Sequence, residues 1–187
     1  MTNPLDAPGP PGAPRPIEPV ERVMLAMAYG VHVIGSRSNS GEYNVMLADW
    51  VMQVSFRPRL AAVAIENDAR TLRFIRETRA FSVNVLHEKG GAQVARKVVM
   101  PAEGSKIKGR SAEAASRVVD KLADLPHTFH ADGVPLLSDC LGWFTCRAEQ
   151  FVEAGDHTIV IGRVTDGAVI RTGDALTEKD LGWEYAG

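Results

Sequence analysis

Hydrophobic and polar positions follow patterns along this chain that predict mainly strands, joined by short helices. Residues 60–65 (LAAVAI) are a continuous apolar run, which is typical of a strand buried on both faces. Residues 81–86 (FSVNVL) alternate instead, so their odd-numbered and even-numbered side chains face opposite sides of a sheet. Residues 142–153 and 157–169 predict a long hairpin that turns around Ala154-Gly155-Asp156.

Helix signals lie between these strands. Residues 21–28 are rich in helix formers, Pro19 suits a first-turn position, and the apolar Met24 and Met27 are expected to pack in the core. A second helix is expected from an N-cap at Asn67 or Asp68 to about Thr78. A third is expected over residues 91–99, before Pro101.

The segment 44–55 (NVMLADWVMQVS) is expected to be one strand, yet its polarity is irregular. It carries Asn44, Asp49, Gln53 and Ser55, with Trp50 among them. Polar and backbone groups that a sheet does not use are suited to binding a planar, hydrogen-bonding ligand. A twisted edge strand with a β-bulge would explain the same pattern, and the residues alone leave both interpretations open.

Length and composition favour one domain over residues 18–187, with residues 1–17 as a flexible tail rich in proline and glycine. A net charge of −2 gives no electrostatic reason to expect nucleic acid as a partner. No apolar run approaches the roughly 20 residues that span a bilayer, and the N-terminus does not look like a signal peptide. Cys140 and Cys146 are expected to be reduced thiols in a cytoplasmic protein, with no metal site.

Two small groups of residues could carry chemistry. Arg70 and Thr71 fall in the first turn of the second helix, where free backbone N–H groups and the helix dipole favour a phosphate. However, Arg70, Arg73 and Arg76 recur every three residues, which would also mark a solvated face. Asp156 and His157 could be a paired acid and base, although aspartate in a tight turn usually serves backbone geometry. No Rossmann, P-loop or hydrolase motif is present in the sequence.

Five segments in order resemble the flavin reductase-like family, the split β-barrels that bind FMN. They are GVHVIG at 30–35, the segment 44–55, Arg57-Pro58 where the family usually has paired prolines, TLRFI at 71–75 followed by FSVNVL at 81–86, and GDHTIVIGRV at 155–164. The resemblance covers about residues 20–187. It implies a mainly β fold, a Greek-key FMN-binding split β-barrel with short helices.

The resemblance also implies an activity and partners. The chain would be an NAD(P)H:flavin oxidoreductase that passes a hydride from the nicotinamide of NADH or NADPH to flavin N5. It would be a homodimer, with Trp183 and Tyr185 closing the barrel or reaching the second subunit, and its reduced flavin would serve a flavin-dependent monooxygenase. A flavoredoxin-like electron carrier without nicotinamide turnover, and a binding module that has lost flavin, are the alternatives. The segment 103–117 would lie over the flavin or meet a partner subunit.

The residues of the site are carried over from the same resemblance. Arg70, Thr71 and the helix start would hold the phosphate, and backbone groups of residues 46–50 and 81–82 would hold the isoalloxazine edge. His157 would border the nicotinamide and act through orientation, unless it only starts a strand and caps its turn. The cofactor-binding set is Asn44, Val45, Met46, Leu47, Ala48, Asp49, Trp50, Gln53, Ser55, Asn67, Arg70, Thr71, Phe81 and Ser82.

Overall fold

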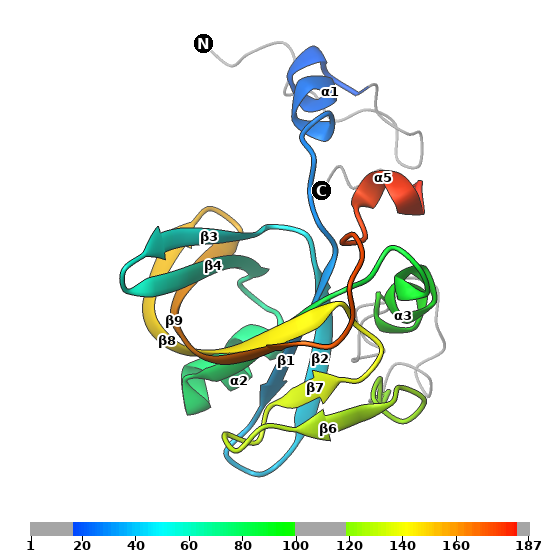
Figure 1. Ribbon diagram of the computed structural model, residues 1–187. Helices are drawn as coiled ribbons and strands as arrows, with labels where there is room; N and C mark the ends of the chain where they lie inside the picture. The colour runs from blue at the N-terminus through cyan, green and yellow to red at the C-terminus, as the bar shows by residue number, and fades with distance from the viewer. Residues whose placement is uncertain (1–16, 100–118, 183–187) are drawn as a thin grey trace, which may run out of the picture.

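An antiparallel sheet of seven strands, in the order β2-β1-β5-β8-β9-β4-β3, curls into a barrel in this computed structural model, which describes residues 17–99 and 119–182 (Figure 1). The strands are β1 (His32–Arg37), β2 (Tyr43–Ala48), β3 (Val51–Phe56), β4 (Arg59–Glu66), β5 (Ala80–Val85), β8 (Gly142–Ala154) and β9 (His157–Val169). A two-stranded ribbon pairs β6 (His127–Phe129) with β7 (Pro135–Leu137). The expected mainly β fold and the long β8–β9 hairpin are confirmed. The tail prediction at residues 1–16, the segment 103–117, Pro101, Trp183 and Tyr185 lie outside the described residues.

Four helices lie among the described residues: α1 (Pro19–Leu25), α2 (Arg70–Thr78), α3 (Gly91–Val98) and α5 (Glu178–Leu181). The second helix ends at Thr78 as predicted, but its predicted N-cap is wrong, because Ala69 occupies that position. Asn67 instead binds the β8–β9 turn: its Nδ2 donates to the Gly155 carbonyl at 3.0 Å, and its Oδ1 accepts from Thr158 at 2.7 Å.

Two hydrophobic clusters lie on opposite faces of β1 and β5. Ile34, Ile75 and Phe81 belong to the cluster inside the barrel, which α2 closes at one end. The other cluster includes Val33 and Leu86 and packs under α3, on the outside of the barrel (Figure 1). Adjacent residues of β1 therefore enter different clusters, as a strand buried on both faces requires.

The predicted alternation in β5 is confirmed. Phe81 and Val83 enter the barrel interior, while Ser82 and Asn84 face the β6–β7 ribbon. Ser82 Oγ donates to the Pro135 carbonyl at 2.5 Å, and Asn84 Oδ1 accepts from the Leu137 amide at 2.8 Å. These hydrogen bonds attach the ribbon to the barrel. They also give each of the two buried polar side chains a partner in place of water.

The segment 44–55 is two strands, so the prediction of a single strand is wrong. The chain turns at Asp49-Trp50, where Asp49 Oδ1 accepts from the Trp50 amide at 2.9 Å and the Asp49 carbonyl accepts from the Val51 amide at 2.8 Å. As a result β2 and β3 form opposite edges of the sheet. The expected edge strand with a bulge is β3, which shifts register between Gln53 and Ser55.

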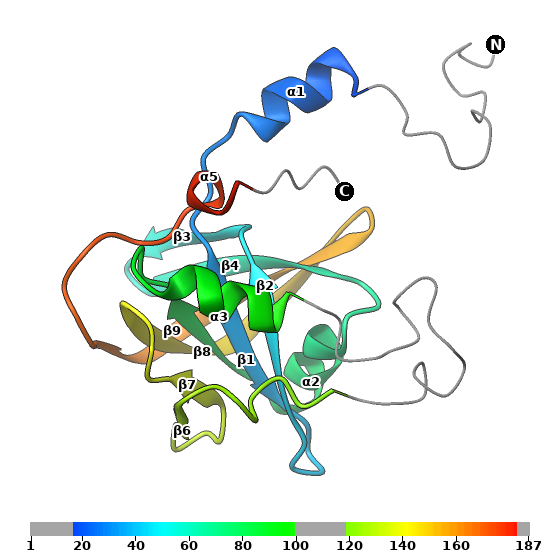
Figure 2. The same cartoon turned by 90° about the vertical axis from the view of Figure 1, so that its right-hand side faces the viewer.

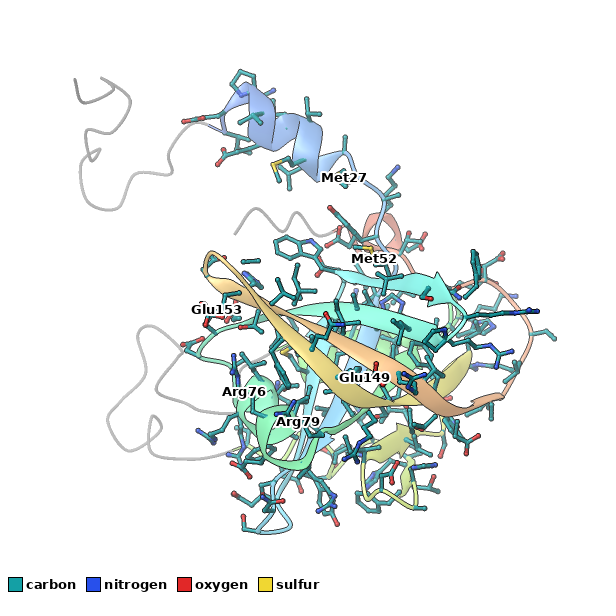
Figure 3. The ribbon with its side chains drawn as sticks, turned by 90° about the vertical axis from the view of Figure 1, so that its left-hand side faces the viewer. Met27, Met52, Arg76, Arg79, Glu149 and Glu153 are labelled. Atoms are coloured by element: carbon teal, nitrogen blue, oxygen red, sulfur yellow. The ribbon has the colours of Figure 1, made fainter. Side chains whose placement is uncertain are left out.

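The first helix projects from the barrel and has no buried residue, so the prediction that Met24 and Met27 pack in the core is wrong (Figure 2). Met24 is 58% exposed and Met27 is 53% exposed. The side of the barrel nearest α1 is β3, whose Met52 and Phe56 are also exposed (Figure 3). Two apolar surfaces, one on α1 and one on β3, therefore lack cover within the described part of the chain.

Candidate functional site

The start of β2 lies against the start of α2, and polar side chains connect the two elements. Asn44 Nδ2 donates to Thr71 Oγ1 at 2.7 Å, and both residues are buried. Arg70 Nη2 lies 2.8 Å from Glu42 Oε1, with the arginine side chain only 10% exposed. Arg70 Nε is buried and has no hydrogen-bond partner, so this guanidinium keeps an unsatisfied donor.

A cavity of about 380 Å³ opens beside these residues. Its lining comes from the start of β2, the start of α2, the segment 119–123 and β6: Tyr43, Asn44, Val45, Arg70, Val119, Asp120, Lys121, Leu122, Ala123, His127 and Phe129. The volume lies within the range of small-ligand sites. Of the predicted site residues, Asn44, Val45 and Arg70 reach this cavity.

The opposite end of β2 gathers a second group of side chains. The ring centroids of Trp50 and His157 lie 5.0 Å apart, which joins the β2–β3 turn to the start of β9. His157 Nδ1 lies 2.7 Å from Asp156 Oδ1, so the predicted acid–base pair is in contact. This hydrogen bond to His157 holds the pKa of the exposed Asp156 carboxyl below its usual value.

Near the β2–β3 turn lie three titratable side chains, those of Asp49, Glu178 and His32. Burial raises the pKa of Glu178 to about 7, helped by a hydrogen bond with Asp49 and by that residue's charge. His32, opposite Ala48 in the β1–β2 ladder, has a buried Nδ1 without a hydrogen-bond partner. Burial lowers the pKa of His32, so its neutral form is favoured.

The predicted residues thus separate into distinct places. Asn44, Arg70 and Thr71 meet at the start of β2, and Asp49, Trp50 and His157 meet at its end. Gln53 and Ser55 lie on β3, where Gln53 Nε2 donates to the Ser55 carbonyl at 3.2 Å. Val45 is a core residue that also lines the cavity. Phe81 and Ser82 are buried in the middle of the sheet, so the structure does not bring these two side chains to a surface.

Sequence reasoning missed Glu178 and most of the cavity. Tyr43, Lys121, His127 and Phe129 are not in the predicted set. The last three lie in the segment 118–130, which has weak periodicity and no motif. Their sequence signal is only the presence of aromatic and basic residues in a polar stretch.

The cysteines have no role in this chemistry. Both are free and buried, as expected for reduced thiols. Burial raises the pKa of Cys140 to about 11 and that of Cys146 to about 12, which suppresses the reactive thiolate. Within residues 17–99 and 119–182, no cluster of three or more metal-ligating side chains could hold an ion. Over the same residues, no helix has the length and apolar character needed to cross a bilayer.

Comparisons with known proteins agree with this architecture. Flavin reductase (NADH) of Kitasatospora aureofaciens is 33% identical over 147 residues, which are 78% of this chain and 68% of that protein. The high molecular weight rubredoxin of Moorella thermoacetica is 29% identical over 83% of this chain, and the probable flavin reductase of Rhizobium meliloti is 31% identical over 75%. The chain spans only 62% and 40% of the length of these last two proteins.

The solved structures show the same fold. BorF, the flavin reductase component of a bacterial two-component tryptophan halogenase, aligns with a TM-score of 0.69 and 26% identity over 87% of this chain and 92% of its own. The flavin reductase PheA2 aligns with a TM-score of 0.66 and 27% identity over 84% and 90%. The expected split barrel is confirmed. The flavin reductase like domain matches residues 24–181, and the chain therefore belongs to the flavin reductase-like family.

Proposed function

We propose that this protein is an NAD(P)H-dependent flavin reductase, a single domain over residues 18–187. Family membership supports this proposal, as does the 33% identity to a flavin reductase that uses NADH. A bound flavin would supply the redox chemistry, because its N5 would accept the hydride from C4 of the nicotinamide. The protein's own contribution is then to bind and orient the two nucleotides.

The residues present suit a flavin. Among the described residues β2 is an edge strand that pairs with β1 alone, so on its other edge backbone groups lie outside the sheet ladder. Those groups, in residues 46–50, are the proposed contacts for the isoalloxazine edge. The observation that carries the proposal is the buried Arg70 Nε without a partner, beside a cavity at the start of the same strand. A flavin phosphate would satisfy this donor through a charge-assisted hydrogen bond.

His157 is the proposed catalytic residue on the nicotinamide side. Its ring contacts Trp50 at the end of β2, and its Nδ1 is held by Asp156. The imidazole ring, fixed by this hydrogen bond, can orient a nicotinamide carboxamide. It need not act as a base, because hydride transfer requires no proton removal by the protein. We therefore expect His157→Ala to raise KM for the nicotinamide nucleotide and leave flavin affinity unchanged.

Steady-state oxidation of NADH and NADPH with added FMN tests the activity. His130→Ala is the matched control. The His130 side chain also contacts aspartates, and its exposed fraction of 16% is close to the 15% of His157. Equal kinetics in the two variants would reject the role of His157. Absence of turnover by the wild-type protein would instead favour the flavoredoxin-like electron carrier, and absence of flavin binding would favour the non-catalytic module.

The phosphate contact has its own test. FMN should bind more tightly than riboflavin, and Arg70→Ala should reduce FMN affinity by about 1–3 kcal/mol, as for a charged hydrogen bond. Arg76→Ala is the control, because Arg76 lies on the same helix but contacts Phe151 and Thr158. Equal losses in the two variants would indicate a diffuse electrostatic effect rather than a contact at Arg70.

The partners follow from the same assignment. We propose a cytoplasmic homodimer in which the exposed surfaces of α1 and β3 meet a second copy. Reduced flavin would pass to a flavin-dependent oxygenase, a proposal supported by BorF, which serves a two-component halogenase. Gel filtration of the reductase alone and with a candidate oxygenase would separate these two associations.

A further inference from the structure

Arginines gather where β5, β8 and β9 lie side by side, away from both ends of β2. In the β8–β9 ladder Arg147 lies directly opposite Arg163, and both residues are exposed. Residues directly opposite in an antiparallel pair project from the same face of the sheet, with Cβ atoms about 5 Å apart. The two guanidinium groups therefore share one face, and like charges in direct opposition destabilise a sheet.

Arg79 extends this group of charges to the start of β5. It comes just before Ala80, which lies opposite Arg147 in the β5–β8 ladder, and the Arg79 carbonyl accepts from the Ala148 amide at 2.7 Å. Neighbouring strands lie about 4.8 Å apart. The backbones of the three arginines therefore follow one another across three strands, over about 10 Å.

The backbone of Arg79 indicates that this arginine is kept for a reason other than stability. Arg79 is the C-cap of α2 with a φ of 61°, and it is the one non-glycine residue with positive φ in the described part of the chain. Glycine is the usual residue at such a helix end, because a Cβ disfavours the left-handed conformation. A left-handed arginine and two opposed arginines are all unfavourable for folding, so binding explains them better.

One carboxylate already neutralises part of this charge. Arg163 Nε donates to Glu149 Oε1 at 2.6 Å. Arg79 has its guanidinium over the ring of Phe151, 4.8 Å from the ring centroid. A guanidinium over an aromatic ring keeps its in-plane N–H groups for a further partner. The surface therefore offers guanidinium donors beside an aromatic ring.

An acidic protein segment fits this surface better than a nucleic acid does. Every second side chain of an extended chain points the same way, at a spacing of about 7 Å, so alternate carboxylates match charges spread over about 10 Å. A nucleic acid presents an unbroken array of phosphates, which would also meet the carboxylates of Glu149 and Glu153 on β8. The net charge of −2 gives the chain no general attraction for polyanions.

We propose that Arg79, Arg147 and Arg163 form a docking surface for an acidic extended segment of a second protein. Arginine suits this role because its planar guanidinium binds a carboxylate through two parallel N–H···O bonds. The docking surface is separate from the proposed flavin site, because the three arginines are not among the residues that line the cavity beside Arg70.

Fluorescein-labelled poly-L-glutamate is the probe, titrated by fluorescence anisotropy at low ionic strength. The double variant Arg79→Gln, Arg147→Gln should bind it about 4- to 25-fold more weakly, since each exposed ion pair contributes about 2- to 5-fold. Arg96→Gln is the matched control, because Arg96 is also an exposed arginine but lies on α3, outside this surface. It should leave the affinity unchanged, and added salt should weaken binding by the wild-type protein.

The stability of Arg147→Gln separates docking from a structural role. Removal of one of two opposed charges should raise the urea midpoint slightly above that of the wild-type protein, while binding of polyglutamate weakens. A lower midpoint would make Arg147 a structural residue and reject the docking role.

Other outcomes would reject the surface or its occupant. Absence of polyglutamate binding, or equal losses in Arg96→Gln and the double variant, would leave only a diffuse electrostatic effect. Tighter binding of a single-stranded oligothymidylate, lost in the double variant, would assign the surface to nucleic acid. A double variant that sediments as a smaller species than the wild-type protein would make it an interface between copies of this chain. Loss of polyglutamate binding with flavin binding and sedimentation unchanged would support the docking surface.

Discussion

The helices α1 and α2 have similar lengths, yet the structure uses them in opposite ways. α2 buries Thr71, Leu72, Phe74 and Ile75, and its hydrophobic face closes the barrel interior. α1 buries none of its residues, although it has a complete capping box between Glu18 and Glu21. Its apolar residues Val20, Val23 and Met24 are 58–71% exposed, and Met27, just after the helix, is 53% exposed.

This difference shows that local helix signals and tertiary burial are separate properties. A helix of seven residues is too short to be stable alone, since isolated helices shorter than about 12 residues are marginal in water. α1 therefore needs a surface that the described part of one chain does not supply. α2, by contrast, is part of the folding unit of the single chain. Substitutions in the two helices should separate these roles.

The largest effect is expected for Ile75→Ala in α2. Ile75 is fully buried inside the barrel, so its truncation should lower the free energy of unfolding by about 2–5 kcal/mol through lost burial and the cavity left behind. Val23→Ala in α1, where the side chain is 71% exposed, should change the free energy of unfolding by less than about 0.5 kcal/mol. Urea unfolding at a protein concentration low enough to favour monomers measures both.

The contrast also shows how much the sequence could predict. Strand alternation and long apolar runs predicted β4, β5, β8 and β9, because burial on a sheet face imposes a fixed period. The same reasoning failed for Met24 and Met27, because an apolar stripe on a helix does not say which molecule will cover it. It also failed at Asp49-Trp50, where a side-chain hydrogen bond ends one strand and the chain crosses to the opposite edge of the sheet.

The site was predictable to a similar extent. Arg70 and Thr71 could be proposed because a helix start favours anions, and Asn44 because it is a polar residue in the irregular segment 44–55. The structure joins the two groups, since Asn44 binds Thr71 and lines the same cavity as Arg70. Glu178 could not be predicted, since its raised pKa arises from burial and from Asp49, a residue far away in the sequence. Backbone patterns predict elements, whereas such tertiary contacts depend on how the elements meet.

The second effect concerns the surface that α1 is proposed to meet. The double variant Val23→Asp, Met24→Asp should weaken dimerisation by more than tenfold, because unpaired carboxylates would be buried at the interface. Val152→Asp is the control, since Val152 is also an exposed apolar residue, at 44%, but lies on β8. Sedimentation over a range of concentrations measures the dissociation constant. A monomeric wild-type protein at every concentration would contradict the proposed role of α1.

The third effect concerns α5, another short helix that buries no residue of its own. Its Glu178 has a folded-state pKa raised from 4.5 to about 7 by burial and by Asp49. The folded protein therefore keeps a proton that the unfolded chain releases, so this contribution to stability is complete below pH 4.5 and is lost as pH rises through about 7.

Glu178→Gln should remove that pH dependence. Over pH 4.5–7 its stability should fall less than that of the wild-type protein, so the variant gains relative to wild type as pH rises. The change should be no more than about 1 kcal/mol, since a largely solvated carboxyl is screened by water. Thermal unfolding across this pH range, with Glu88→Gln as the control, measures the difference. Parallel pH profiles for Glu178→Gln and the wild-type protein would contradict the assignment.

The smallest effect concerns the exposed face of α2, which completes the contrast with α1. Arg76 of α2 and Arg79, its C-cap, lie over the ring of Phe151 on β8, at 5.0 Å and 4.8 Å from its centroid (Figure 3 labels both arginines). If these cation–π contacts hold α2 against the β8–β9 hairpin, Arg76→Ala and Arg79→Ala should each lower the free energy of unfolding by about 0.5 kcal/mol.

Phe151→Leu tests whether the ring is responsible, because leucine keeps apolar bulk but lacks the negative face that attracts a guanidinium. In that background the arginine substitutions should have little further effect, so the double-mutant cycles should give a coupling of about 0.5 kcal/mol. If the coupling is zero, Arg76 and Arg79 form only a solvated face, as their three-residue spacing also allows. The attachment of α2 would then rest on its buried residues and on the contacts of Arg70 with Glu42 and of Thr71 with Asn44, and hydrophobic burial would be the main difference from α1.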